Sequence, residues 1–261
     1  MSLYKYYQPE SVGFILTKNG VSVRLSQPEL LNDPFEGKPA HSHFFLERDV
    51  YEVLDNFISE DAAEVTDEEL YLIKEIPKFY QKQKHTNWAV NNTFGISSFS
   101  KNEKSNPMWA YYSKDHTGFL IEFEDFNTMK PYFHHAGHGI SVKYTANRYD
   151  QKEHKESWLK YIVNSMIRKD SAWTHEREFR VISHLEGAQY DQVDDMGFPI
   201  YSIEIPKKHI KRIILGYRSS KSLARKVMLW KFKTSPETLV EKATLNDEKF
   251  LLDYEPFYPH A

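Results

Sequence analysis

The chain between residues 93 and 125 constrains the fold most strongly, because it has the pattern of a strand, a short helix and a second strand. TFGISSFS and TGFLIEFED have the length and composition of strands. SNPMWAYYSKDH, between them, has Pro107 near its start, where the first turn of a helix tolerates proline. Elsewhere strand and helix patterns do not alternate, so we expect an α+β protein and not a doubly wound parallel sheet.

Further helices and strands are predicted on both sides of this region. Residues 9–19 have the pattern of a short helix, with Pro9 in its first turn and Gly20 as the residue that stops it. Residues 219–232 predict a basic helix capped by Ser219 or Ser220. Strands are expected at residues 3–7, 20–26, 139–146, 176–182, 197–206, 209–216, 238–245 and 249–257.

An acidic block at residues 47–85 is expected to be a helical insertion in the mixed fold. Thr66 and Glu69 make a capping box, and apolar residues follow at helical spacing. Residues 47–75 hold eleven Asp and Glu against two basic residues. Residues 1–261 are predicted to form a single domain, whose mixed, mainly antiparallel sheets enclose a cleft.

Composition excludes several classes of protein. The absence of cysteine excludes disulfides, zinc–thiolate sites and a thiol nucleophile. No segment approaches the roughly 18 consecutive apolar residues that cross a bilayer, and the N-terminus lacks the layout of a secretory signal. We therefore expect a cytoplasmic protein without membrane contact. Paired histidines such as His41 and His43 have no carboxylate at matching spacing, so no metal is expected.

The stretch SAWTHEREFRVI places charged residues at intervals of two. In an extended chain Glu176, Glu178 and Arg180 would share one face, while Phe179 and Val181 would fill the other against a core. Such a row is either a solvated outer face with internal ion pairing or the wall of a site.

Three other stretches are dense in polar and aromatic residues, although each could be purely structural. Lys5 lies between two tyrosines in LYKYY, and LLNDPFE has Asn32, Asp33 and Glu36 beside Phe35. In the third stretch three serines precede a group of aromatic residues. These are Ser97, Ser98 and Ser100, followed by Trp109, Tyr111, Tyr112 and His116.

Five segments together resemble a bacterial family known as domain of unknown function 2971. They are LYKYY, FILTKNGVSVRLSQPELLNDPFE, ISSFSKNEKSNPMWAYYSKDHTGFLIEFE, WTHEREFRVI and IKRIILGYRSS. The resemblance runs in order from about residue 3 to about residue 220. NDPFE, MWAYYSKDHTG and Glu-x-Glu-x-Arg are its most specific parts, and the family name implies no activity.

The layout is also similar to the ADP-ribosyltransferase superfamily, whose members bind NAD in a cleft between two small antiparallel sheets. That resemblance implies a first strand with His or Arg, a middle strand with Ser or Tyr, and a late strand with a catalytic Glu-x-Glu. Lys5 falls at the first position, residues 97–100 at the second, and Glu176 and Glu178 at the third. The sequence departs from the pattern at Lys5, which is neither His nor Arg.

The superfamily resemblance assigns a role to each candidate residue. Glu178 would stabilise the positive charge that develops on the ribose as nicotinamide leaves, and Glu176 would orient the acceptor or the ribose. The implied partners are NAD as substrate and a macromolecular acceptor, in bacterial phage defence or a toxin system. The candidate NAD-binding residues are Lys5, Tyr6, Arg24, Ser98, Ser100, Tyr111 and Tyr112.

Two alternatives need no catalysis. Residues 207–233 contain ten Lys and Arg and no acidic residue, so they could bind nucleic acid. The residues expected to do so are Lys207, Lys208, Lys211 and Arg212. A protein-interaction module using the acidic residues 47–75 is the second alternative.

Overall fold

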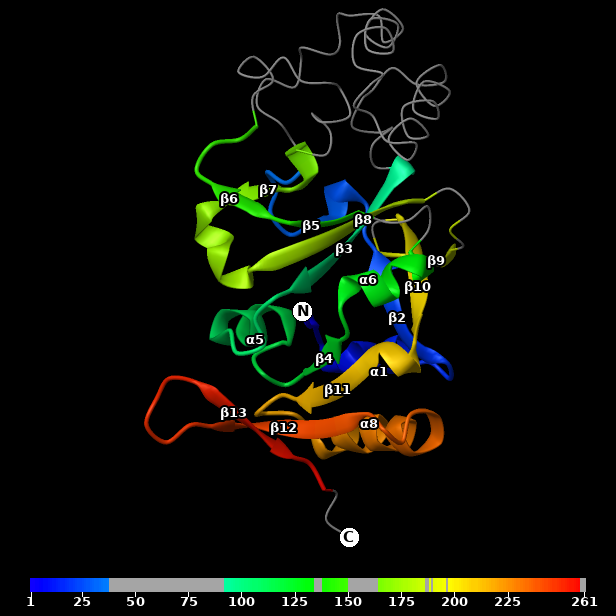
Figure 1. Ribbon diagram of the computed structural model, residues 1–261, viewed down its shortest axis with the longest axis vertical. Helices are drawn as coiled ribbons and strands as arrows, with labels where there is room; N and C mark the ends of the chain where they lie inside the picture. The colour runs from blue at the N-terminus through cyan, green and yellow to red at the C-terminus, as the bar shows by residue number, and fades with distance from the viewer. Residues whose placement is uncertain are drawn as a thin grey trace, which may run out of the picture.

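The computed structural model describes residues 1–37, 92–133, 138–149, 164–185, 188, 190–195 and 197–258. The predicted acidic helical insertion at residues 47–85 lies outside these residues. The described elements confirm an α+β fold, with helices around mixed, mostly antiparallel sheets (Figure 1).

An eight-stranded sheet forms the main layer, in the order β13-β12-β11-β4-β1-β3-β8-β5. Neighbouring strands are antiparallel except β11 and β12, which are parallel. Its strands are β1 (Leu3–Tyr7), β3 (Phe94–Ser100), β4 (Phe119–Phe123), β5 (His138–Ser141), β8 (Glu178–His184), β11 (Ile210–Leu215), β12 (Leu239–Leu245) and β13 (Leu252–Pro256).

Two smaller sheets complete the strand layer. One has the order β2-β10-β9, and the other pairs β6 with β7 in parallel. Their strands are β2 (Gly20–Leu25), β9 (Tyr190–Val193), β10 (Pro199–Pro206), β6 (Lys143–Thr145) and β7 (Arg168–Asp170). The single strand predicted at residues 139–146 is therefore divided between β5 and β6.

Gly20 does not end a helix, as its position after a helical pattern predicts. It opens β2 opposite Pro206, and a Cβ atom there would lie 2.0 Å from the carbonyl oxygen of Ile205. The preceding helical segment ends earlier, as one 3₁₀ turn (Pro9–Ser11) followed by α1 (Val12–Ile15). Glycine is needed here because two strands approach closely, not because a helix stops.

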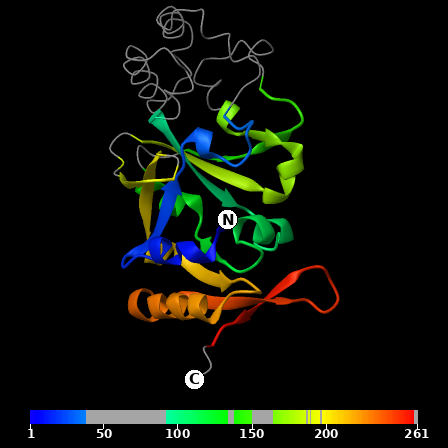
Figure 2. The same cartoon turned by 180° about the vertical axis from the view of Figure 1, so that it is seen from behind.

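Two predicted helices, α5 (Asn106–Tyr112) and α8 (Lys221–Thr234), are present. α5 has proline in its first turn. The short α6 (Phe126–Met129), which no pattern predicted, follows β4. α8 begins at Ser220, whose Oγ accepts from the Leu223 amide at 3.1 Å. This cap decides between the two serines that the sequence offered. Figure 2 shows α8 running along β12, near the edge of the sheet that the last strands of the chain form.

The eight-stranded sheet opens at a seam between β1 and β3. β1 pairs with β4 at five positions but with β3 only through Tyr4 and Ser100. Beyond that pair β3 leaves β1, and Ile96 exchanges two backbone hydrogen bonds with Ser26, at 2.8 and 2.9 Å. The seam divides the sheet into β3-β8-β5 and β1-β4-β11-β12-β13.

Candidate functional site

A pocket of about 230 Å³ lies at this seam. Its walls come from β1, β3, β7, β8, α5, the 3₁₀ segment Ser171–Glu176 and the chain after β2. We call it the carboxylate pocket, because two carboxylates, Glu176 and Glu178, line it. The other polar side chains in its wall are Tyr4, Lys5, Tyr6, Ser26, Asn32, Ser98, Ser100, Tyr112 and Lys169.

The local conformation around Arg177 turns both carboxylates into the pocket. Glu176 ends a 3₁₀ segment that Asp170 caps by accepting from the Ala172 amide at 2.8 Å. Arg177 then adopts a left-handed conformation with φ of 45°, and β8 begins at Glu178. The expectation that Glu176 lies in the strand is therefore wrong, although it and Glu178 line one pocket.

Arg180 holds Glu178 from the next position on the same face of β8. Its Nε donates to Glu178 Oε1 at 2.8 Å and its Nη2 donates to Oε2 at 2.9 Å. The same guanidinium also donates to Glu36 Oε2 and to the Met166 carbonyl. Its side chain is 0% exposed, so every polar contact is made inside the protein.

Lys169 joins the three carboxylates of the site. Its Nζ lies 2.8 Å from Glu36 Oε1, 2.7 Å from Glu176 Oε2 and 3.8 Å from Glu178 Oε2. We call Glu36, Lys169, Glu176, Glu178 and Arg180 the buried ion cluster. Two cations therefore face three anions in a region with almost no solvent contact, where an unpaired charge is costly.

The paired cations keep Glu178 ionised. Burial alone would raise the pKa of Glu178, but Arg180 and Lys169, together with a hydrogen bond from Ser98, lower it below its ordinary value. Burial would lower the pKa of Lys169, but Glu178, Glu36 and Glu176 raise it. Burial outweighs the nearby cations at Glu36, whose pKa is raised. The pocket thus contains a fixed anion at Glu178.

Lys5 is the third cation of the site. It is half-buried in the seam, and its Nζ donates to the Ser98 carbonyl at 2.6 Å. β1 does not pair with β3 at Ser98, so this carbonyl has no partner in β1. Burial lowers the pKa of Lys5 to about 8, and Glu178 opposes that shift. When Lys5 is protonated, three cations balance the three carboxylates.

A closed ring of hydrogen bonds covers Glu176. Asn32 Nδ2 donates to the Tyr112 hydroxyl at 2.5 Å, and that hydroxyl donates to Glu176 Oε1. Lys169 contacts Glu176 Oε2 and also donates to Asn32 Oδ1, at 3.2 Å. The ring links the loop after β2, α5, β7 and the 3₁₀ segment, so it fixes Glu176 from four parts of the chain.

The NDPFE motif, residues 32–36, forms a turn that contacts the buried ion cluster. Asp33 Oδ1 accepts from the Phe35 amide at 2.9 Å, and the Glu36 amide donates to the Asp33 carbonyl at 3.0 Å. This turn places Asn32 on the ring and Glu36 on Arg180 and Lys169. The motif therefore supplies a turn and two side chains, Asn32 and Glu36, that contact the cations of the cluster.

Most candidate NAD-binding residues meet at the carboxylate pocket. Tyr6 donates to the Asn102 carbonyl at 2.8 Å, and Ser100 donates to the Glu176 carbonyl at 2.7 Å. Both hydroxyls are therefore bonded to the backbone. The NAD-binding candidates in the pocket wall are Lys5, Tyr6, Ser98, Ser100 and Tyr112, and the catalytic candidates Glu176 and Glu178 line it too.

Two candidates lie outside the carboxylate pocket. Arg24 is paired with Asp194 at 2.9 Å on the β2-β10-β9 sheet. Tyr111 is 67% exposed, with its ring tilted toward His175 on the outside of α5. Of the two tyrosines proposed as an aromatic wall, only Tyr112 is in the pocket wall.

The four basic residues proposed for nucleic-acid binding differ in their contacts. Lys207 donates to the Thr234 carbonyl at 2.7 Å, Lys211 donates to Ser2 Oγ at 2.9 Å, and Lys208 is exposed. Arg212 is enclosed by the carboxylates of Glu103, Glu122 and Glu241, which outnumber its charge.

Sequence reasoning missed Lys169 and gave no role to Glu36 or Asn32. Lys169 lies in the ordinary charged run RKD, seven residues before Glu176, and no spacing marks it. Glu36 and Asn32 stood out as part of a polar cluster, but their partners are 80 or more residues away in sequence. In the described part of the chain, no group of three or more His, Asp or Glu residues is arranged to hold a metal.

Comparison with known proteins gives one match. No curated protein matches the chain, and no solved structure matches it. None of the described helices combines the length and apolar character needed to cross a membrane. Residues 108–181, which carry Tyr112, Lys169, Glu176, Glu178 and Arg180, match the family model described as protein of unknown function (DUF2971).

Proposed function

We propose that the chain is an ADP-ribosyltransferase-like enzyme that transfers ADP-ribose from NAD to a macromolecule. One observation carries the proposal: Lys5 on β1, Ser98 on β3 and Glu178 on β8 line a single pocket at the seam of the sheet. These are the three strands on which the superfamily resemblance puts its site residues. Residues scattered over a solvated surface would not converge in this way.

The proposed reaction replaces one bond at the anomeric carbon of the nicotinamide ribose. The carbon–nitrogen bond breaks with its electron pair going to nicotinamide, and positive charge develops on the ribose. An oxygen or nitrogen of the acceptor then bonds to that carbon and loses its proton. A carboxylate that is already ionised and fixed stabilises this charge without reorganising, which is the property that Glu178 has.

The pairing of Glu178 with Arg180 is compatible with this role. A carboxylate has about four acceptor positions, and the two donors of Arg180 occupy two of them. Ser98 takes a third position, and Glu178 still lines the pocket, so one position is left for the ribose. Arg180 reduces the net charge of the site, but it also fixes the orientation of the carboxylate.

The pairing of the cations favours the nicotinamide end of NAD over its phosphates in this pocket. Lys5, Lys169 and Arg180 balance Glu36, Glu176 and Glu178, and each cation already has an acceptor. A phosphate would have to displace these contacts. The positively charged nicotinamide riboside has no such conflict, and the Tyr112 ring offers it an aromatic surface.

Transfer can be tested with NAD labelled in its adenylate part and a bacterial lysate as the source of acceptors. The wild-type protein should label a macromolecule, and Glu178→Gln should reduce labelling by about 10²-fold or more. A cooperative unfolding transition in the variant shows that it is folded. Labelling that persists in folded Glu178→Gln removes this carboxylate from the reaction.

A further inference from the structure

A second pocket of about 220 Å³ adjoins the carboxylate pocket. Lys169 lines both, and Glu36 lines the second, so the buried ion cluster separates them. Asp33, Phe35, residues 145–149, Ser165, Arg168 and Asp170 form the rest of its wall. We call it the arginine pocket, after Arg148 and Arg168.

The acidic groups of the arginine pocket already have donors. Asp33 accepts from the Phe35 amide, and Asp170 accepts from the Ala172 amide. Glu36 is held by Lys169 and Arg180. These contacts fix the three carboxylates in place, and the two cations that contact Glu36 offset its charge.

Arg168 supplies a cation that, among the described residues, forms no ion pair with a carboxylate. Its guanidinium lies over the Tyr149 ring, 4.8 Å from the ring centroid. Its Nε is buried and has no hydrogen-bond partner within the same residues. A buried nitrogen of a cation without an acceptor is costly, and an anion beside the guanidinium would stabilise its charge.

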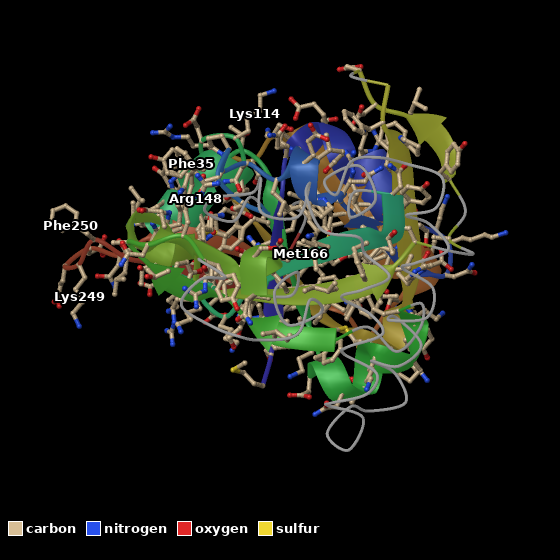
Figure 3. All side chains as sticks on the ribbon, turned by 90° about the horizontal axis from the view of Figure 1, so that it is seen from above. Phe35, Lys114, Arg148, Met166, Lys249 and Phe250 are labelled. Carbon is tan, nitrogen blue, oxygen red and sulfur yellow. The ribbon has the colours of Figure 1, made fainter. Side chains whose placement is uncertain are left out.

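An aromatic ring and a second guanidinium flank this cation. Arg148 lies over Phe35, 5.7 Å from the ring centroid, and Figure 3 shows the two side chains next to each other. Phe35 is 61% exposed although it is apolar, because the turn made by Asp33 holds it outward. Exposed aromatic rings beside arginines are a common surface for stacking bases near phosphates.

We infer that the arginine pocket binds the phosphate group of a nucleotide. Arg168 would donate to the phosphate oxygens in a charge-assisted contact, and Phe35 would offer its ring to the base. The cations in the carboxylate pocket are committed to protein groups, so the neighbouring pocket is the better place for a phosphate. This inference concerns binding alone and does not depend on ADP-ribose transfer.

Calorimetric titration of the full chain with ADP, inorganic pyrophosphate and adenosine tests the inference. We expect ADP to bind, adenosine not to bind measurably, and Arg168→Gln to weaken ADP binding about tenfold or more. Arg225→Gln, on the exposed face of α8, is the matched control and should leave ADP binding unchanged. Tighter binding of ADP than of pyrophosphate identifies the nucleotide as the ligand, and equal binding identifies a free phosphate.

A second variant keeps the test valid if Arg168→Gln does not fold. If Arg168→Gln does not unfold cooperatively, Phe35→Ala takes its place, because that ring is on the surface, and it should weaken ADP more than pyrophosphate. The inference is overturned if neither ADP nor pyrophosphate binds the wild-type protein, or if folded Arg168→Gln binds both as the wild type does. Glu178→Gln should still bind ADP, so loss of transfer activity and loss of phosphate binding are separate results.

Discussion

Two arginine-centred ion clusters lie in opposite halves of the eight-stranded sheet, and they differ in burial. Arg180 on β8 is 0% exposed, and its partners Glu36 and Glu178 are 1% and 6% exposed. Arg212 on β11 is 19% exposed, with carboxylates that are 10% to 25% exposed. We call the second group, Arg212 with Glu103, Glu122 and Glu241, the outer ion cluster. The first cluster borders the carboxylate pocket, and the second does not.

The difference in burial suggests different roles for the two clusters: the buried ion cluster belongs to a site, and the outer ion cluster links strands. Burying ions costs several kcal/mol per ion, and apolar residues of similar size often replace a buried pair without loss of stability. Stability alone therefore does not explain the buried ion cluster, whereas a pocket that needs fixed charges does. The outer ion cluster joins β4, β11 and β12 and is more exposed than the buried ion cluster, so stability is explanation enough.

The largest expected effect is on stability when Arg180 is removed. Arg180→Met leaves Glu178 and Glu36 buried with less compensation, and we expect the free energy of unfolding to fall by about 3–5 kcal/mol. Arg212→Met removes a partly solvated cation and should cost about 1 kcal/mol. Urea denaturation of both variants measures the difference, and equal losses would contradict the distinction between the two clusters.

The next effect is a pH dependence that only the buried region should show. Burial lowers the pKa of Lys5 to about 8, from 10.5 for an ordinary lysine. Between these pH values the unfolded chain keeps a proton that the folded chain releases, so raising the pH stabilises the folded state. The free energy of unfolding of the wild type relative to Lys5→Met should rise by about 1.4 kcal/mol per pH unit in this window.

The difference between wild type and Lys5→Met should be constant from pH 6 to about pH 7, because Lys5 is then protonated in both states. Denaturation at a series of pH values gives the comparison. A difference that stays flat from about pH 8 to 10, or that falls, would show that Lys5 is not buried as a cation in the seam.

A pair of tyrosine variants separates function from stability more finely. Tyr112→Phe removes the hydroxyl between Asn32 and Glu176, and Tyr254→Phe removes one that donates to the Glu103 carbonyl beside the outer ion cluster. Each should cost about 1 kcal/mol of stability. Only Tyr112→Phe should also lower the rate of nicotinamide release from NAD, and an equal loss in Tyr254→Phe would assign both hydroxyls a structural role.

The smallest expected effect is the response to salt. The Debye length, over which salt screens charges, shortens to about 3 Å at 1 M salt. Salt therefore weakens interactions between partly exposed charges much more than between buried ones. The stability lost in Arg212→Met should shrink between about 0.1 and 1 M sodium chloride, while the loss in Arg180→Met should persist. A matching decrease in both would mean that water reaches the buried ion cluster.

The sequence predicted the strands better than the site, for a physical reason. Alternation and apolar runs are local, so β2, β3, β4 and the start of α8 near residue 220 followed from neighbouring residues. Local pattern failed where tertiary contacts override it. Gly20 opens a strand because Ile205 is close, and Glu176 leaves the strand pattern because Arg177 turns the chain.

The buried ion cluster could be predicted only in part. The spacing of Glu178 and Arg180 put them on one face, and the structure pairs them on that face. Nothing local connects them to Glu36 or Lys169, whose charges reach the cluster from the loop after β2 and from β7. Pairing between distant segments depends on the opening of the sheet at β1 and β3, which no pattern within either strand encodes.

The most direct test of the account is the rate at which purified protein releases nicotinamide from NAD, compared between Glu178→Gln and Glu103→Gln. Each variant removes one carboxylate charge from an arginine cluster, but only Glu178 lines the carboxylate pocket. The account predicts that Glu178→Gln loses release by about 10²-fold or more while Glu103→Gln keeps the wild-type rate. Wild-type release in folded Glu178→Gln, or equal losses in both variants, would contradict it.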